Sequence, residues 1–135
     1  MKKLFLLLLI SVLASCSTAT THVINPISVA QSPTFTLKIY NDTENLSQNI
    51  SNRIQQLGFR PFANNSSQPD YAVFVDYKTY WDVAYQTFEH FVISFKDAKT
   101  SETLITSNYI GRVGFNSCNG AMDIVFGDIA AKLGK

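Results

Sequence analysis

Hydrophobic residues fall at every second position in several short stretches of the chain, as expected for strands that bury one face. Apolar side chains alternate with other residues across 35–40, 71–77 and 91–95. The stretch 103–112 is rich in β-branched and aromatic residues, which favour strands. The pattern therefore predicts four strands, three of them in the second half of the chain.

Two other stretches have the spacing of an amphipathic helix. In the first, one apolar face is formed by Leu46, Ile50, Ile54 and Leu57. Polar side chains at 41–43 can cap its start, and Gly58 can end it. In the second, which begins near Asn119 and runs to the carboxyl terminus, the apolar face comprises Met122, Val125, Phe126, Ile129, Ala130 and Leu133.

The order of these elements is strand, helix, three strands, helix. This order predicts an α+β fold, a two-layer sandwich with a mainly antiparallel four-stranded sheet and two helices on one face. The segment 59–62 returns toward the sheet, and 63–69 is a surface loop. The aromatic segment 78–85 is either a continued strand or a protruding hairpin tip.

The amino terminus carries an export pattern. Lys2 and Lys3 precede an apolar run over 4–13, which is too short to span a bilayer. The run ends in Leu13-Ala14-Ser15-Cys16, which resembles the bacterial lipobox, although an ordinary signal peptide cut elsewhere is the alternative. We expect a signal peptide over 1–15, a lipidated Cys16 with a flexible tether over 16–32, and a single α+β domain over 33–135. Part of the tether can pack as an edge strand.

The lipobox resemblance also implies a location. Acyl chains on Cys16 would anchor the protein in a membrane. The residue after the cysteine is Ser17 rather than the aspartate linked to inner-membrane retention. We therefore expect an outer-membrane lipoprotein on the periplasmic side.

Charge and cysteine content narrow the function classes. Without residues 1–15, the basic residues fall from 11 to 9 against 10 acidic ones, a net charge of −1 that gives no basic field for nucleic acid. With Cys16 acylated, Cys118 has no partner for an intrachain disulfide, and we expect it to be buried. It could instead pair with another chain, or react if a base such as His90 lay beside it.

No motif predicts catalysis, a metal or a cofactor. The carboxylates of the sheet region have no spacing typical of a glycosidase pair, and turn or edge positions explain most of them: Asp70, Asp76, Asp82, Glu89, Asp97 and Glu102. The two histidines and Cys118 lack the spacing of metal ligands. We expect the protein not to be an enzyme.

The best candidate binding surface is aromatic. Tyr80, Trp81 and Tyr85 lie close together, with Tyr77 and Phe88 on either side of them. Tyr and Trp dominate protein interfaces, and their faces also stack on sugars. The alternative is that alternate members of this cluster fill the core.

Four segments carry a resemblance to known proteins: the strand leading into 41–43, the helix ending at 57–59, the strand entry at 70–73 and the hairpin over 95–100. This layout resembles small periplasmic domains of bacterial lipoproteins, such as those of LpoB and CsgG and the amino-terminal domain of TolB. The segment 35–75 also resembles the early part of TraT. The resemblance implies work in the envelope through protein or cell-wall contacts.

These observations lead to two function hypotheses. The first is a membrane-anchored, non-catalytic binding or accessory module that contacts another envelope protein. The alternative is a self-assembling structural component of an envelope secretion or conjugation complex.

Overall fold

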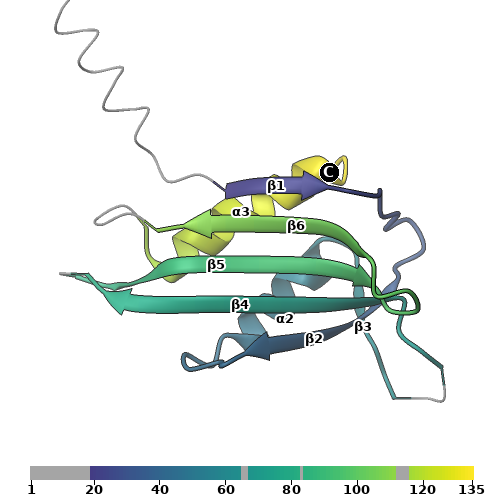
Figure 1. The fold of residues 1–135 in the computed structure, drawn as a ribbon, viewed down its shortest axis with the longest axis horizontal. Coiled ribbons are helices and arrows are strands. Elements are labelled where there is room, and N and C mark those ends of the chain that lie inside the picture. The colour runs from purple at the N-terminus through teal and green to yellow at the C-terminus, as the bar shows by residue number, and fades with distance from the viewer. Residues whose placement is uncertain (1–18, 65–66, 83, 112–115) are drawn as a thin grey trace, which may run out of the picture.

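The computed structural model describes residues 19–64, 67–82, 84–111 and 116–135. These residues form one six-stranded sheet and two helices that lie behind it (Figure 1). The elements in chain order are β1 (Ala19–Val23), β2 (Thr34–Tyr40), α2 (Ser47–Gln56), β3 (Arg60–Pro61), β4 (Tyr71–Trp81), β5 (Gln86–Asp97), β6 (Thr103–Ile110) and α3 (Cys118–Lys132).

The sheet is mixed, which corrects the predicted mainly antiparallel four-stranded sheet. Its strand order is β1-β6-β5-β4-β2-β3, and β2 runs parallel to both β4 and β3. The chain leaves β2, passes through α2 and enters β3 and then β4 in the same direction as β2, since a connection through a helix joins parallel strands. The α+β class, with two helices on one face, agrees with the prediction.

The two additional strands lie at the edges of the sheet, where the hydrophobic pattern is weak. β1 pairs with β6, and only one of its five residues is buried. β3 has two exposed residues, one of which is Pro61, a residue that sheets tolerate at an edge. Part of the segment expected as a tether, 16–32, thus forms β1.

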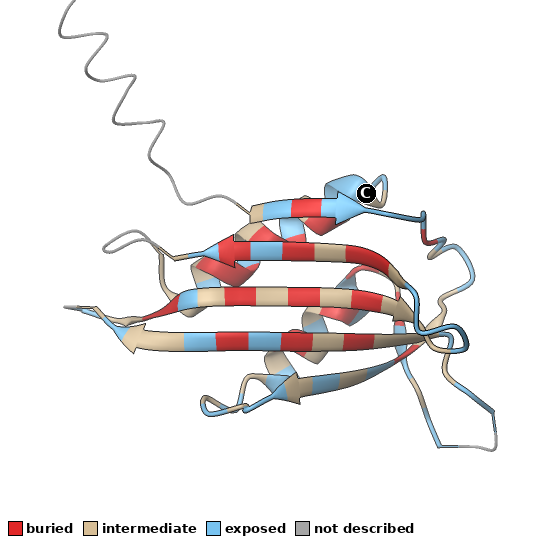
Figure 2. Ribbon diagram, viewed as in Figure 1, coloured by how far each residue is buried: buried red, intermediate tan, exposed pale blue. Residues whose placement is uncertain are grey.

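The core fills the space between the helices and one face of the sheet. Along β4, β5 and β6, buried positions alternate with more exposed ones, as Figure 2 shows. Ile50 and Ile54 of α2 are fully buried. α2 ends as predicted, because Gly58 has a φ of +106°, a conformation that favours glycine. The side chains on the other face of the sheet form its open face.

A β-bulge interrupts the pairing of β4 with β5. Lys78 pairs with His90, but Thr79 pairs with Phe88, so β5 carries one extra residue, Glu89. The bulge shifts by one residue the alternation of β5 side chains between the two faces of the sheet. Phe88 and Phe91 therefore both face the core, with ring centroids 5.0 Å apart.

Two glycines provide a matched test of the packing at this bulge. A Cβ at Gly111 would lie 1.6 Å from the carbonyl oxygen of Phe88, whereas a Cβ at Gly127 in α3 would meet nothing within 4 Å. We expect Gly111→Ala to lower the free energy of unfolding, because the backbone must move apart. Gly127→Ala should raise it by about 1 kcal/mol through helix propensity. Urea denaturation measures both, and equal effects would contradict the close approach at Gly111.

Candidate functional site

The predicted aromatic cluster divides between the core and the surface. Tyr77 and Phe88 are buried and pack edge to face, with ring centroids 5.5 Å apart. Trp81, the last residue of β4, is 76% exposed, while Tyr80 and Tyr85 are half-buried. The β4 strand continues to Trp81, and a hairpin tip follows, in which the Asp82 N–H donates to the Tyr85 carbonyl at 3.0 Å. The segment 78–85 therefore contains both of the predicted alternatives, a continued strand and a hairpin tip.

Tyr77 ties β4 to the segment that leads into α2. Its hydroxyl donates to Asp42 Oδ1 at 2.6 Å and accepts from the Glu44 N–H at 3.0 Å. The Asp42 carboxylate also accepts from the N–H groups of Leu46 and Ser47, at 2.8 and 3.2 Å. Asp42 therefore accepts hydrogen bonds from the first N–H groups of the helix, although the N-cap position belongs to Leu46 and not, as predicted, to one of residues 41–43.

These contacts shift two pKa values. Burial alone raises the pKa of the Asp42 carboxyl, but the hydrogen bonds from Tyr77, Leu46 and Ser47 outweigh burial and hold it below its usual value. Burial, followed by the hydrogen bond to Asp42, raises the pKa of Tyr77 to about 12. The bond therefore favours a charged Asp42 and a neutral Tyr77.

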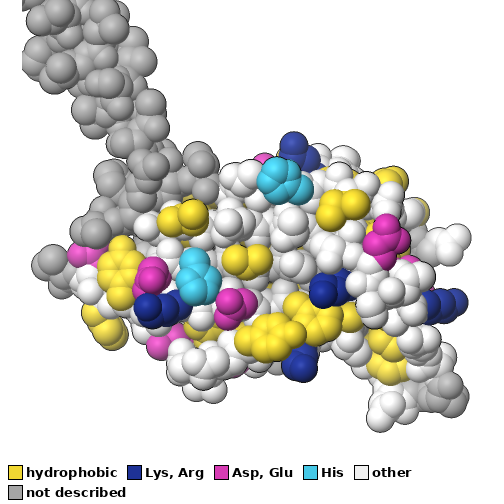
Figure 3. Space-filling model, in the orientation of Figure 1, with side chains coloured by type: hydrophobic (Ala, Val, Ile, Leu, Met, Phe, Trp, Pro, Cys, Tyr) yellow, Lys and Arg dark blue, Asp and Glu magenta, His cyan; other side chains and the backbone are white. Residues whose placement is uncertain are grey.

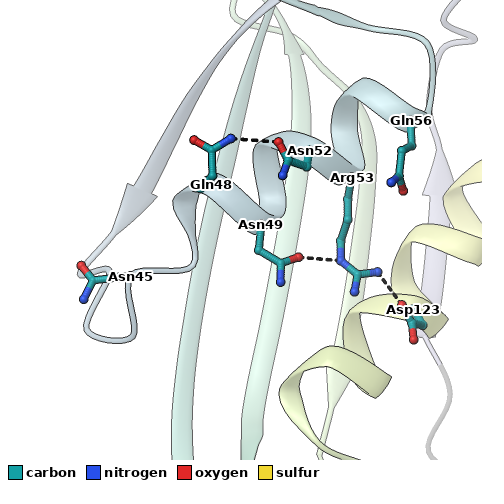
Figure 4. Close-up of a pocket in the computed structure, with 7 residues that line it drawn as sticks. All are labelled: Asn45, Gln48, Asn49, Asn52, Arg53, Gln56 and Asp123. Carbon is teal, nitrogen blue, oxygen red and sulfur yellow. Dashed lines mark hydrogen bonds and ion pairs between the residues drawn. The ribbon is translucent and has the colours of Figure 1, made fainter.

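A polar groove runs between the two helices (Figure 4). We call it the amide groove; it has a volume of about 640 Å³ and is lined by Asn45, Gln48, Asn49, Asn52, Arg53, Gln56 and Asp123. Arg53 organises it, because its Nε donates to Asn49 Oδ1 at 2.8 Å and its Nη1 contacts Asp123 Oδ1 at 2.6 Å. Arg53 is largely buried, with its guanidinium over the Phe126 ring.

Side-chain amides supply most of the hydrogen-bonding capacity of the amide groove. Gln48 donates to Asn52 at 2.8 Å, and Asn49 donates to Asn119 of α3 at 3.1 Å. An amide has two donor hydrogens and an acceptor oxygen that can take two bonds, so these contacts leave capacity for a ligand. The amide groove can therefore bind a polar segment through hydrogen bonds.

The open face of the sheet carries a small aromatic patch. Tyr40 and Phe74 stack with centroids 6.1 Å apart, and Lys38 and Lys96 lie over these two rings. Figure 3 shows this face, with hydrophobic side chains gathered over β2 and β4. Because the lysines cover part of the two rings, the patch exposes less aromatic surface than the rings alone would.

The suggested reactive pair of Cys118 and His90 does not form. Cys118 packs against the core at the start of α3, while His90 lies on the open face, 3.4 Å from Asp76. Burial, followed by the charge of Glu44, raises the pKa of Cys118 to about 11. A half-buried thiol with this pKa stays protonated at neutral pH.

Several of the sheet-region carboxylates hold turns and strand ends in place. Asp70 accepts from the N–H and hydroxyl of Thr34, and Asp97 accepts from the N–H groups of Lys99 and Thr100. Within the described residues, no group of three or more His, Cys, Asp or Glu side chains could hold a metal ion. No helix in the described part of the chain is long and apolar enough to cross a membrane.

Sequence reasoning did not find the amide groove. The polar face of α2 is visible in the sequence as amide residues between the apolar positions. Asp123, however, lies 70 residues after Arg53, and only the packing of α3 beside α2 brings them together. The predicted lipid-attachment residue, Cys16, lies outside the described residues.

The sequence matches no known protein-family profile and no curated protein sequence. Solved structures with a similar fold include two of the PelC dodecamer from Paraburkholderia phytofirmans. One, a variant with a single leucine-to-methionine substitution, is 6% identical with a TM-score of 0.61, covering 89% of this chain and 100% of that chain. The other is 8% identical with a TM-score of 0.60, covering 84% of this chain and 95% of that chain.

Two further structures are more distant or only partly covered. A PDZ domain protein from Parabacteroides distasonis is 11% identical with a TM-score of 0.55, covering 85% of this chain but 34% of that one. A minor lipoprotein from Acinetobacter baumannii is 15% identical with a TM-score of 0.33, covering 76% of this chain and 90% of that one. At these identities the likeness shows the fold alone. The resemblance to LpoB, CsgG, TolB and TraT stays a prediction.

The hydrogen bond between Tyr77 and Asp42 gives a pH test. The unfolded chain loses the Tyr77 proton near pH 10 and the folded protein near 12, so the free energy of unfolding should fall as pH rises between these values. We expect Tyr77→Phe to lower stability at pH 7 by about 1–3 kcal/mol and to make this alkaline fall smaller. The control is Tyr40→Phe, at an exposed position. Denaturation at several pH values measures both effects, and an unchanged alkaline fall would contradict the assignment.

Proposed function

We propose that this chain is a lipid-anchored accessory protein of the bacterial envelope, acylated on Cys16 and facing the periplasm from the outer membrane. The lipobox-like Leu13-Ala14-Ser15-Cys16 and the following Ser17 support the anchor and its location. The domain is a non-catalytic binding module in this proposal. Acyl chains would keep it at the membrane, where its partner is another envelope protein.

The amide groove is the observation that carries the binding proposal. Its side chains come from both helices and from the loop before α2, and the Arg53 contacts hold Asn49 and Asp123 in place (Figure 4). No aromatic or aliphatic side chain is among its lining residues in the described part of the chain. A polar, hydrogen-bonding segment of the partner fits this chemistry better than an apolar anchor does.

Self-assembly is the second candidate function, and the exposed edge of β1 favours it. Within the described residues β1 pairs with β6 alone. An unpaired strand edge can pair with another chain. The similar PelC structures are dodecamers. Copies of this chain would in that case associate around an envelope complex.

The anchor is tested by Cys16→Ser. We expect the wild-type protein to fractionate with outer membranes and the variant to appear in the soluble periplasmic fraction, because the acyl chains have lost their attachment atom. Intact-mass measurement of the membrane-bound protein should show the added acyl mass on a chain that begins at Cys16. A processed Cys16→Ser protein that stays with the membrane would contradict the anchor.

The binding proposal is tested by photo-crosslinking in cells. A photoreactive residue at Asn52, in the groove, should capture a distinct envelope protein, and the same residue at Thr36, on the open face, serves as the control. We expect Gln48→Ala with Gln56→Ala to reduce capture, since both side chains are exposed and neither contributes to the core.

Mass spectrometry of the captured species separates the two candidate functions. Capture of another copy of this chain would favour self-assembly. No capture at Asn52, or equal capture from Asn52 and Thr36, would contradict binding at the amide groove.

A further inference from the structure

The strand register places the start of β1 and the β4–β5 hairpin tip at the same end of the sheet. Ala19 pairs with Tyr109, Tyr109 with Phe91, and Phe91 with Tyr77, so these four residues form one row across the sheet. Trp81 lies four residues beyond this row along β4, or about 13 Å at 3.3 Å per residue. Figure 1 shows the hairpin extending past β1 at this end.

A lipid anchor on Cys16 would hold this end of the sheet close to the membrane. Cys16 precedes Ala19 by three residues, which span at most about 11 Å even when fully extended. The hairpin tip reaches a similar distance beyond the same row. The acylated residue and Trp81 can therefore lie at the same membrane surface, which is why this inference rests on the proposed acylation of Cys16.

The exposed side chains at this end suit a lipid surface. Trp81 is 76% exposed and Ile110, at the end of β6, is 64% exposed. Tryptophan and tyrosine concentrate at membrane interfaces, where the ring meets the acyl boundary and the polar group stays hydrated. Tyr80 and Tyr85 lie beside Trp81 in the hairpin.

Among the residues that the structure describes at this end, the charges do not form a basic cluster. Lys78 forms an ion pair with Glu89 at 2.8 Å, and Asp82 adds a further acidic group next to Trp81. Attraction to anionic lipid requires clustered basic residues. Contact at this end would therefore depend on the aromatic and aliphatic side chains, with little dependence on salt.

We propose that the β4–β5 hairpin tip, with the exposed Trp81 at the end of β4, rests in the headgroup region of the anchoring membrane. It is a second membrane contact besides the acyl chains. The two contacts together set the strands roughly upright on the bilayer. The opposite end of the sheet, with the β5–β6 turn and residue 24, then points away from the membrane.

Trp81 is the only tryptophan of the chain, so its fluorescence reports on this contact directly. The experiment uses the full-length lipoprotein purified from membranes and reconstituted in vesicles of phosphatidylethanolamine and phosphatidylglycerol. We expect the Trp81 emission to lie at shorter wavelength in vesicles than in the Cys16→Ser protein in solution. Lipids brominated near the headgroup should quench it, a soluble quencher should lose access to it, and added salt should change neither result.

The control moves the tryptophan to the other end of the sheet. In Trp81→Phe with Ile24→Trp, the probe replaces a residue that is 57% exposed beyond the end of β1. This position lies about 30 Å from Trp81 along the strand direction. Brominated lipid should not quench it, and the soluble quencher should.

The outcomes distinguish this inference from the anchor itself. The mass of the reconstituted protein shows whether Cys16 carries acyl chains. If it does, and brominated lipid quenches Trp81 no more than the tryptophan at 24, the membrane contact is wrong while the anchor stands. If Cys16 carries no acyl chains, the anchor and the membrane contact of the hairpin are both wrong. If the quenching of Trp81 by brominated lipid disappears at high salt, the contact depends on charge, which would contradict the proposed apolar contact.

Discussion

Phe88 and Phe91 face the same side of the sheet although strict alternation would put them on opposite sides. The extra residue Glu89 makes this possible, because the bulge resets the side-chain direction of β5. Much of the remaining structure depends on this shift. Phe88 packs against Tyr77, whose hydroxyl donates to Asp42 in the segment before α2. The backbone carbonyl of Phe88 lies against Gly111. The core, the start of one helix and the exit from β6 therefore meet at one place.

The β4–β5 hairpin has two parts with different environments. Around the bulge, Tyr77, Phe88 and Phe91 are buried beneath the helices. Toward the tip, β4 continues to Trp81, whose side chain is mostly exposed. One hairpin thus supplies part of the core and an aromatic tip outside it. This is why five aromatic residues that are close in sequence serve different purposes.

Coverage of one face of the sheet leaves three distinct surfaces for binding. The amide groove lies between the helices, the stacked pair of Tyr40 and Phe74 lies on the open face, and the hairpin tip lies at one end. Their chemistry differs: the groove offers hydrogen bonds, the stacked pair is partly covered by lysines, and the tip offers an exposed tryptophan. A lipid anchor at Cys16 would bring the tip to the membrane surface.

The sequence by itself determined the α+β class, the two helices and the long strands, because each has a strong local period. The sequence did not predict the edge strands β1 and β3, because a strand with one neighbour and little burial has almost no hydrophobic pattern. The parallel pairing of β2 with β4 is set by where the chain returns after α2 rather than by its residues. The ion pair of Arg53 with Asp123 is likewise tertiary, because it joins residues that only helix packing brings together. Local periodicity determines the elements, whereas long-range packing decides their neighbours and the surfaces they make.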